Sequence, residues 1–282
     1  MSTIEQLLDY GKDKLIQSGN EYAKYDRKVL LEAALGCNYM YMLTHGEEEV
    51  SQDKEQQYRS WIKRRSEHYP LQYLLGYAHF MDYTFVVNEH VLIPRNDTEI
   101  LVENANTVLA DMEKQQDKVK ILDLCCGSGC IGISLKLYHE KINLTLSDVS
   151  EEALAVTRQN LGKYQVDAKV HCGNLFEGIS DVYDMIVSNP PYIESRVIDT
   201  LMPEVREYEP MLALDGGEDG LVFYRSIIQQ AVSHLGEHGW LFFEIGYNQG
   251  KDVATLMEDN GFSEVQVVKD YAGLDRVVYG HL

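Results

Sequence analysis

The amino-acid sequence predicts an α/β protein in which a mostly parallel, seven-stranded sheet follows a small helical bundle and a β-hairpin. Residues 1–75 carry apolar residues at helical spacing. Residues 76–95 are rich in aromatic and β-branched side chains, which favour strands. Over residues 96–282, apolar runs of strand length alternate with helical stretches, which is typical of a parallel sheet covered on both faces. We therefore expect a bundle, a hairpin linker and a sheet domain with these boundaries.

The first 75 residues predict several short helices. Two of them cover residues 3–16 and 26–36, and Gly36 is expected to stop the second. A third covers residues 51–70, with Ser51 as its N-cap and Pro70 at its end. Helices this short are stable only when they pack together, so we expect a bundle.

The next stretch, residues 77–95, predicts a hairpin whose turn is Met81-Asp82. Beyond it, the last two expected strands are separated only by Tyr-Ala-Gly-Leu, which is too short for a crossover helix, so the final strand should be antiparallel. A helix that begins after Ser150, with two glutamates in its first turn, is one of the connections. The seven expected strands cover residues 119–124, 142–148, 168–172, 183–189, 239–246, 264–270 and 275–281.

Composition narrows the class of protein. The chain has 282 residues, of which 45% are hydrophobic, as in a folded globular protein. It has no run of 18 apolar residues and no signal-peptide pattern at its start, so no membrane span is expected. Five cysteines without a Cys-x-x-Cys pair favour reduced thiols, a cytoplasmic location and no metal.

The negative charge is concentrated in the sheet domain. The net charge is -20, and residues 1–75 contribute only -2, because they hold 10 basic against 12 acidic residues. An acidic surface repels phosphate backbones, so we expect no direct nucleic-acid partner for this half, whereas a basic protein would suit it. Acidic residues also aid solubility, so the negative charge could serve solubility alone and need not indicate a partner.

A glycine-rich turn follows the first strand of the sheet. Gly127, Gly129 and Gly132 fit G-x-G-x-x-G, and Asp148 lies 21 residues after Gly127. The glycines let the backbone approach a ligand closely, and the acid can accept hydrogen bonds from ribose hydroxyls. A turn that only packs a helix against a strand is the alternative.

Both NAD and S-adenosylmethionine fit such a turn. Asp123, four residues before Gly127, favours S-adenosylmethionine, because a carboxylate at the mouth of the turn suits a cationic ligand better than a pyrophosphate. The Asn-Pro-Pro-Tyr sequence that ends the fourth strand has no task in hydride transfer, and it also favours a methyl donor.

The chemistry of Asn189, Pro190, Pro191 and Tyr192 suits a planar amino group. Proline fixes φ and has no N–H, so two prolines hold the Asn189 oxygen and the Pro190 carbonyl rigidly. These two acceptors would each take one N–H of a glutamine amide or an adenine amine, and would balance the positive charge that grows as the nitrogen attacks a methyl sulfonium. Tyr192 would pack against the flat group. A Pro-Pro turn capped by asparagine is the structural alternative.

Several segments, in order along the chain, resemble the release factor glutamine methyltransferases (the PrmC, formerly HemK, family): residues 67–103, 121–135, 183–193, 202–228, 241–250 and 269–280. The resemblance covers nearly the whole chain and is weakest in the first 30 residues and in 105–118. It implies a Rossmann-like class I S-adenosylmethionine-dependent methyltransferase domain, with S-adenosylhomocysteine as the product. It also implies methylation of the N5 amide of the glutamine in the Gly-Gly-Gln motif of bacterial class 1 peptide chain release factors.

The resemblance also implies roles for particular residues. Asn189 to Tyr192 would hold the glutamine, with Asn189, Pro190 and Tyr192 as the catalytic residues, and the bundle and hairpin would help to grip the factor. A monomer is expected. The implied cofactor-binding residues are Cys125, Cys126, Gly127, Ser128, Gly129, Asp148, Asn174, Leu175 and Asn189.

The sequence departs from the family pattern in three places. Cys125 and Cys126 replace a Gly and a Thr, Asn174 and Leu175 replace an Asp and an aromatic residue, and Asn96 replaces a proline. Cofactor affinity is the property that these changes affect most. Three other functions remain open: glutamine methylation of a ribosomal protein, N6-adenine methylation of a nucleic acid, and binding of S-adenosylmethionine without catalysis.

Overall fold

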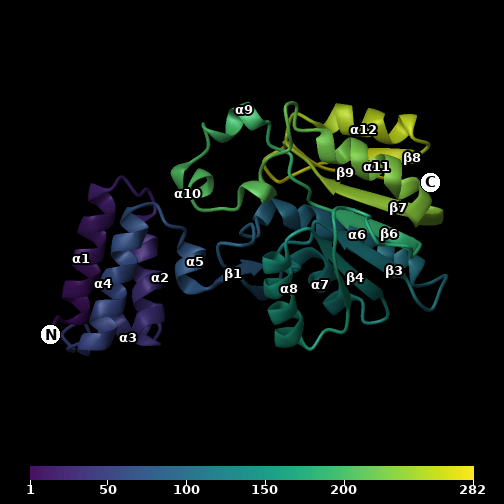
Figure 1. Ribbon diagram of the computed structural model, residues 1–282. Coiled ribbons are helices and arrows are strands. Elements are labelled where there is room, and N and C mark those ends of the chain that lie inside the picture. The colour runs from purple at the N-terminus through teal and green to yellow at the C-terminus, as the bar shows by residue number, and fades with distance from the viewer. The chain divides into compact units, whose positions relative to one another are not determined.

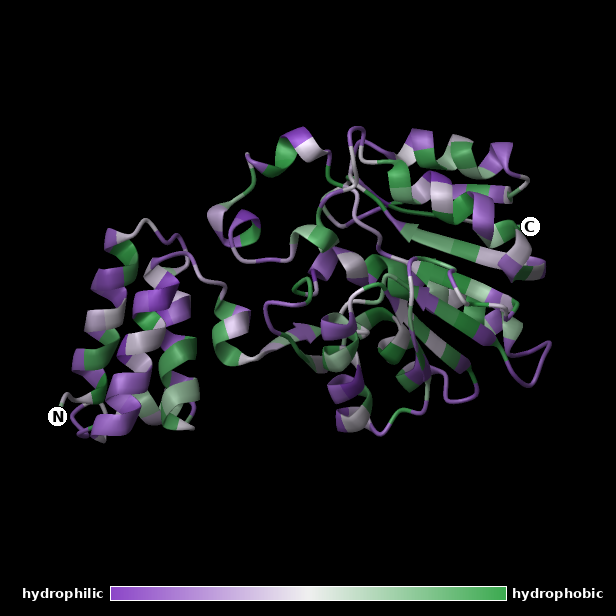
Figure 2. Ribbon diagram, viewed as in Figure 1, coloured by the Kyte–Doolittle hydropathy of each residue, from purple (hydrophilic) through white to green (hydrophobic).

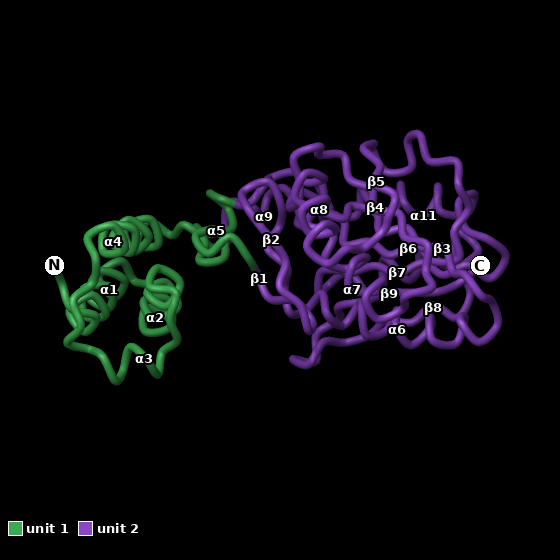
Figure 3. The backbone as a smooth tube through the Cα atoms, turned by 90° about the horizontal axis from the view of Figure 1, so that it is seen from below, with its two compact units in different colours: residues 1–77, 202–208 green, residues 78–201, 209–282 purple.

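The computed structural model describes residues 1–282, and its backbone divides into two compact units. The first unit contains Met1–Tyr77 and Met202–Tyr208, and the second contains Ala78–Leu201 and Glu209–Leu282 (Figure 3). No helix in either unit has both the length and the apolar composition that a membrane crossing requires.

The first unit is helical (Figure 1). Its core consists of buried aliphatic side chains and Tyr58. Figure 2 shows that hydrophilic and hydrophobic residues alternate along α1 and α4. The left-handed Gly36 ends α2, as predicted. Ser51 stands at the start of α4 but its side chain makes no capping hydrogen bond, and α4 ends at Ser66 instead of Pro70. The helices are α1 (Ile4–Gln17), α2 (Ala23–Leu35), α3 (Tyr39–Thr44), α4 (Gln52–Ser66), α5 (Leu71–Leu75) and α10 (Pro203–Arg206).

A buried ion pair joins the distant segment 202–208 to these helices. The Arg65 side chain donates to Asp26 over 2.7 Å and to Glu204 over 2.8 Å, and Arg65 and Asp26 are both buried. In addition, the Tyr208 hydroxyl donates to the Glu67 carbonyl over 2.8 Å. Local sequence patterns do not indicate that this segment packs with the first unit, because the ion pair joins residues 139 positions apart in the chain.

The predicted hairpin is present as β1 (Tyr77–Phe80) and β2 (Tyr83–Val86), which pair on either side of Met81-Asp82. Asn160 of α8 (Glu151–Tyr164) accepts from the Val86 N–H over 2.7 Å. This hydrogen bond attaches the end of β2 to α8 of the sheet domain.

The central sheet confirms all seven predicted strands, and its order is β5-β4-β3-β6-β7-β9-β8. β9 is antiparallel to both of its neighbours, as the short connection predicted. The strands are β3 (Lys120–Leu124), β4 (Asn143–Asp148), β5 (Lys169–Cys172), β6 (Tyr183–Ser188), β7 (Leu235–Glu244), β8 (Ser263–Lys269) and β9 (Asp275–His281).

Helices cover both faces of this sheet, and alternate residues of β3, β6, β7 and β9 enter two separate cores. Ile121 of β3 packs with α6, α7 and α8, whereas Leu122 packs with α11 and α12. Figure 2 shows β3, β6 and β7 as largely hydrophobic strands between these layers. The helices are η1 (Asn96–Thr98), α6 (Glu99–Met112), α7 (Cys130–Tyr138), α8, α9 (Ser195–Ile198), η2 (Met211–Ala213), α11 (Val222–His234) and α12 (Gly250–Asp259).

The strand order reverses direction at β3. The chain runs from β3 outward to β4 and β5, and then returns to place β6 on the other side of β3. In open α/β sheets, ligands bind beyond the carboxyl ends of the strands at such a reversal. The fold therefore predicts a ligand site at the residues that follow β3 and β6.

Candidate active site

The last residues of β3 and β6 are register partners, Leu124 and Ser188. The Ser188 hydroxyl donates to the Leu124 carbonyl over 2.7 Å, which fixes the two strand ends together. Cys125 and Asn189 are the next residues, so the glycine-rich turn and the Asn-Pro-Pro-Tyr sequence start side by side at one edge of the sheet. This placement agrees with the sequence prediction.

The turn after β3 adopts a backbone that glycine favours. Gly127 has φ of 53° and Gly129 has φ of 78°, and Gly129 leads directly into α7. Cys125, which stands where the family has a glycine, also has a positive φ, of 61°. A Cβ atom at Gly132 would lie 2.9 Å from the Asp123 carboxylate, so that position requires glycine for close packing.

Asp123 differs from the prediction that it would face a cationic ligand. Its side chain is fully buried, its Oδ2 accepts from the Gly132 N–H over 2.8 Å, and its Oδ1 has no partner. Burial raises the pKa of this carboxyl to about 7. Asp123 does not line the cavity at this edge, so its role is to hold the start of α7.

Asp148, the last residue of β4, lies at the cavity as predicted. Its Oδ2 accepts from the Gly127 N–H over 2.9 Å and its Oδ1 from the Ser150 N–H over 3.0 Å. Burial raises the pKa of this carboxyl, and the backbone donors oppose the shift. Each carboxylate oxygen can accept a second hydrogen bond, so the pair of ribose hydroxyls expected here would find acceptors.

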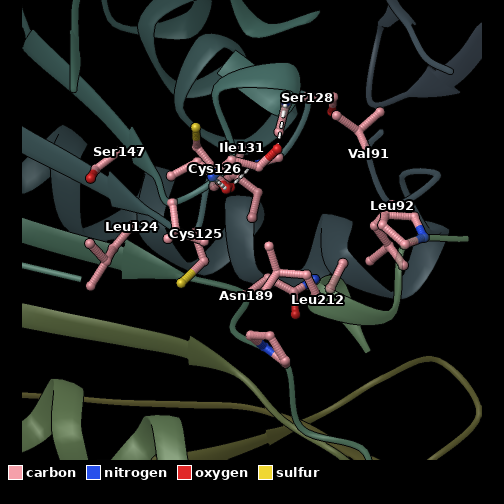
Figure 4. A pocket seen from close by; sticks show the side chains of 18 of the residues that line it. Val91, Leu92, Leu124, Cys125, Cys126, Ser128, Ile131, Ser147, Asn189 and Leu212 are labelled. Atoms are coloured by element: carbon pink, nitrogen blue, oxygen red, sulfur yellow. Dashed lines mark hydrogen bonds between the residues drawn. The ribbon is translucent and has the colours of Figure 1, made fainter. Parts of the chain in front are cut away.

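One cavity joins these elements and encloses about 1020 Å³, part of it open to solvent. Figure 4 places Cys125, Cys126, Ser128 and Asn189 around it. Gly129, Pro190 and Tyr192 do not line it. The predicted site residues that do line it are Cys125, Cys126, Gly127, Ser128, Asp148, Asn174, Leu175, Asn189 and Pro191.

Asn174 and Leu175 follow β5 and border the cavity near Asp148. The Gly173 N–H donates to the Asp148 carbonyl over 3.1 Å, which places this loop next to the end of β4. Leu175 is buried and has φ of 53°. An apolar surface and an amide oxygen beside a carboxylate fit an adenosine group, although leucine cannot stack as an aromatic ring would.

Asn189 and Pro190 present two unused acceptors. The Asn189 amide nitrogen is directed toward the Thr98 hydroxyl, 3.5 Å away, and no hydrogen bond in the structure engages Asn189 Oδ1. The Pro190 carbonyl accepts no backbone hydrogen bond either. Tyr192 is placed differently from the expectation, because its ring packs against the core and its hydroxyl donates to Glu244 over 3.2 Å. Its contact with a flat substrate group stays a prediction.

Two further segments also line the cavity, and the residue chemistry alone did not identify them. They belong to stretches 67–103 and 202–228, so the family resemblance was the signal that pointed to them. Glu209 joins the two segments, because it pairs with Arg95 and accepts from the Ile93 N–H over 3.2 Å. The additional lining residues are His90, Val91, Leu92, Pro94, Arg95, Thr98, Pro210, Leu212, Ala213 and Phe223.

The fold and the site define an S-adenosylmethionine-dependent methyltransferase. The tight turn, the acid at the end of β4 and the apolar pocket beside it fit that cofactor, and a methyltransferase small-domain family model matches residues 99–206. A family model for the PrmC N-terminal domain matches residues 6–76.

The chain belongs to the release factor glutamine methyltransferases. It is 37% identical to the release factor glutamine methyltransferase of Geobacter sulfurreducens, over 99% of this chain and 97% of the relative. The enzyme of that name from Clostridium botulinum is also 37% identical, over 98% of both chains. The family resemblance seen in the sequence is thereby confirmed.

Solved structures with low sequence identity share the fold. The hMettl16 catalytic domain superimposes with a TM-score of 0.56 at 12% identity, covering 86% of this chain and 92% of that one. A 16S rRNA methyltransferase of Thermus thermophilus, solved with S-adenosylmethionine and guanosine, gives 0.51 at 15% identity, covering 73% and 49%. These likenesses support the Rossmann-like architecture and nothing finer.

Proposed function

We propose that this enzyme transfers a methyl group from S-adenosylmethionine to the side-chain amide nitrogen, N5, of the glutamine in the Gly-Gly-Gln motif of bacterial class 1 release factors. The observation that carries the proposal is a pair of unused acceptors on adjacent residues: Oδ1 of Asn189, which lines the cofactor cavity, and the Pro190 carbonyl. The choice of a release factor as the substrate comes from the names of the relatives.

The chemical difficulty is that an amide nitrogen is a poor nucleophile, because its lone pair is delocalised into the carbonyl. The bound cofactor would supply an electrophilic methyl group on a sulfonium. Asn189 and Pro190 would each accept one N–H of the amide, orient its nitrogen and stabilise the positive charge that develops on it. No strongly basic side chain is required, because the methylated amide nitrogen is strongly acidic while it carries the positive charge and would lose one proton to water, which leaves the neutral N-methyl amide. The two prolines keep the acceptors fixed before the substrate arrives.

The charge distribution favours a protein partner for the catalytic half. Residues 76–282 carry a net charge of -18, the difference between the total of -20 and the -2 of residues 1–75. A nucleic acid would be repelled by such a surface, and a basic protein domain would be attracted. Action as a monomer in the cytoplasm stays part of this proposal.

Mass spectrometry after incubation with S-adenosylmethionine tests the proposal. Three substrates are offered separately: a purified class 1 release factor, ribosomal proteins from the large subunit, and DNA. We expect one methyl group on the glutamine of Gly-Gly-Gln and no modification of the other two. Modification of a ribosomal protein or of adenine, with an unmodified release factor, would overturn it.

A further inference from the structure

Residues 209–216 form a strap that is attached at both ends to segments of the active site. At its first end the Glu209 side chain is only 2% exposed, and both of its oxygens are used. Oε2 accepts from the Ile93 N–H over 3.2 Å, and Oε1 pairs with the Arg95 side chain. These two partners flank Pro94, which lines the cavity. A buried carboxylate that accepts from two donors is a firm attachment, because each bond involves a charged group.

The second end of the strap lies against the Asn-Pro-Pro-Tyr sequence. The Ile193 N–H donates to the Leu214 carbonyl over 3.0 Å, and the Gly216 N–H donates to the Ile193 carbonyl over 2.8 Å. Ile193 directly follows Tyr192. A Cβ atom at Gly216 would lie 2.7 Å from the Tyr192 Cα atom, so the two main chains approach so closely that only glycine fits. The strap is therefore joined closely to the residues that would hold the substrate amide.

Between these two ends, η2 presents one apolar side chain at the cavity and a second one outside it. Leu212 lines the cavity, as Asn189 does (Figure 4), and is 56% exposed. Met211 is 50% exposed and does not line the cavity. The strap is attached to the chain that follows β6, and β6 lies on the other side of β3 from β4 and β5. Leu212 is therefore expected near Asn189 and away from Asp148 at the end of β4.

We propose that Leu212 is a specificity-determining residue: it fills the space beside the substrate glutamine, so that only a residue without a side chain fits before that glutamine. The inference rests on the proposed function and deepens it, because it gives the glycine that precedes the glutamine a steric reason. A steric restriction is selective only if the restricting group cannot move away. The attachments at Glu209 and Gly216 provide that rigidity, since they hold the main chain on both sides of Leu212.

A release factor with alanine in place of the glycine before the glutamine tests this restriction. With the wild-type enzyme, we expect kcat/KM for this alanine factor to be about 10- to 100-fold lower than for the natural factor, as excess bulk causes in a fitted site. Leu212→Ala removes the restricting side chain, so the difference should shrink to less than about threefold. Because Leu212 is half exposed, this variant should keep its Tm, and its Kd for S-adenosylmethionine should stay within about threefold of the wild-type value.

Met211→Ala is the matched control, because it shortens the neighbouring exposed side chain of the same strap without changing the cavity. It should discriminate between the two factors as strongly as the wild type does. Glu209→Gln is a second variant that acts through the attachment of the strap. Its amide has one acceptor oxygen, whereas the Ile93 N–H and Arg95 are both donors that bind different oxygens. The strap should therefore be held less firmly, and discrimination against the alanine factor should fall at least about threefold.

Three results would overturn the role of Leu212. The first is equal methylation of the two factors by the wild-type enzyme, which would mean that no restriction exists. The second is discrimination that stays at the wild-type level in Leu212→Ala, which would place its origin in the substrate main chain. The third is a loss of discrimination in Met211→Ala as large as that in Leu212→Ala. A wild-type enzyme that methylates neither factor would instead remove the proposed function itself.

Discussion

The main-chain N–H of Gly127 donates to the Asp148 carboxylate over 2.9 Å, which ties the turn after β3 to the end of β4. The same carboxylate borders the cavity. One side chain thus shapes the turn and offers acceptors to the ligand.

We expect Asp148→Asn to weaken S-adenosylmethionine binding by about one to two orders of magnitude, or about 1.4–2.8 kcal/mol. An amide has one acceptor oxygen, so its NH2 group would face either the Gly127 or the Ser150 N–H. Isothermal titration calorimetry measures the affinity. Wild-type affinity in the folded variant would show that the acid contributes nothing to binding.

The buried Asp123 predicts a dependence of stability on pH. Its pKa in the folded chain, about 7, lies above the ordinary value of 3.8, so the folded state binds the proton more tightly than the unfolded state. The contribution of this group is therefore fully present below pH 4 and is lost as the pH rises toward 7 and beyond. Asp123→Asn should flatten this part of the curve of unfolding free energy against pH. A curve that matches the wild type would contradict the assignment.

The buried ion pair between Arg65 and Asp26 predicts that removing Arg65 strongly destabilises the first unit. Removing one partner leaves an uncompensated buried charge, so Arg65→Ala should lower the free energy of unfolding by about 3 kcal/mol. Arg158→Ala is the control, because it breaks an exposed pair with Glu151 and should cost less than about 1 kcal/mol. Urea unfolding compares the two. Equal losses of unfolding free energy in the two variants would mean that burial of the Arg65 ion pair does not increase its contribution to stability.

The positive φ at Cys125 predicts backbone strain in the cofactor turn. A residue with a Cβ atom pays about 1 kcal/mol there that glycine avoids. Cys125→Gly should therefore be more stable than Cys125→Ala by about that amount, since both variants lose the thiol. Thermal unfolding of the two proteins gives the difference. A more stable alanine variant would argue against strain at this position.

Much of the fold could be predicted from the sequence, because local patterns decide it. The seven strands, the antiparallel last strand and the caps at Gly36 and Ser150 follow from spacing and turn chemistry. The attachment of 202–208 to the first unit could not be predicted, because it depends on a buried ion pair between residues far apart in the chain.

The site was predictable to the same extent. Residues at strand ends, such as Asp148 and Asn189, could be placed because parallel strands end at one edge. The side-chain directions of Asp123 and Tyr192 could not, because burial and hydrogen bonds with Gly132 and Glu244 determine them. The spacing of residues in the sequence indicates neither the burial of these side chains nor their hydrogen-bond partners.

The most direct test of the account compares wild-type enzyme with Asn189→Ala on a purified class 1 release factor and S-adenosylmethionine. Tandem mass spectrometry should find a methyl group on the Gly-Gly-Gln glutamine with the wild type. With Asn189→Ala, we expect a rate about 10²- to 10³-fold lower, because one of the two acceptors for the amide is gone while the fold is kept. Methylation of the same glutamine at the wild-type rate would contradict the central claim that Asn189 positions and activates the amide.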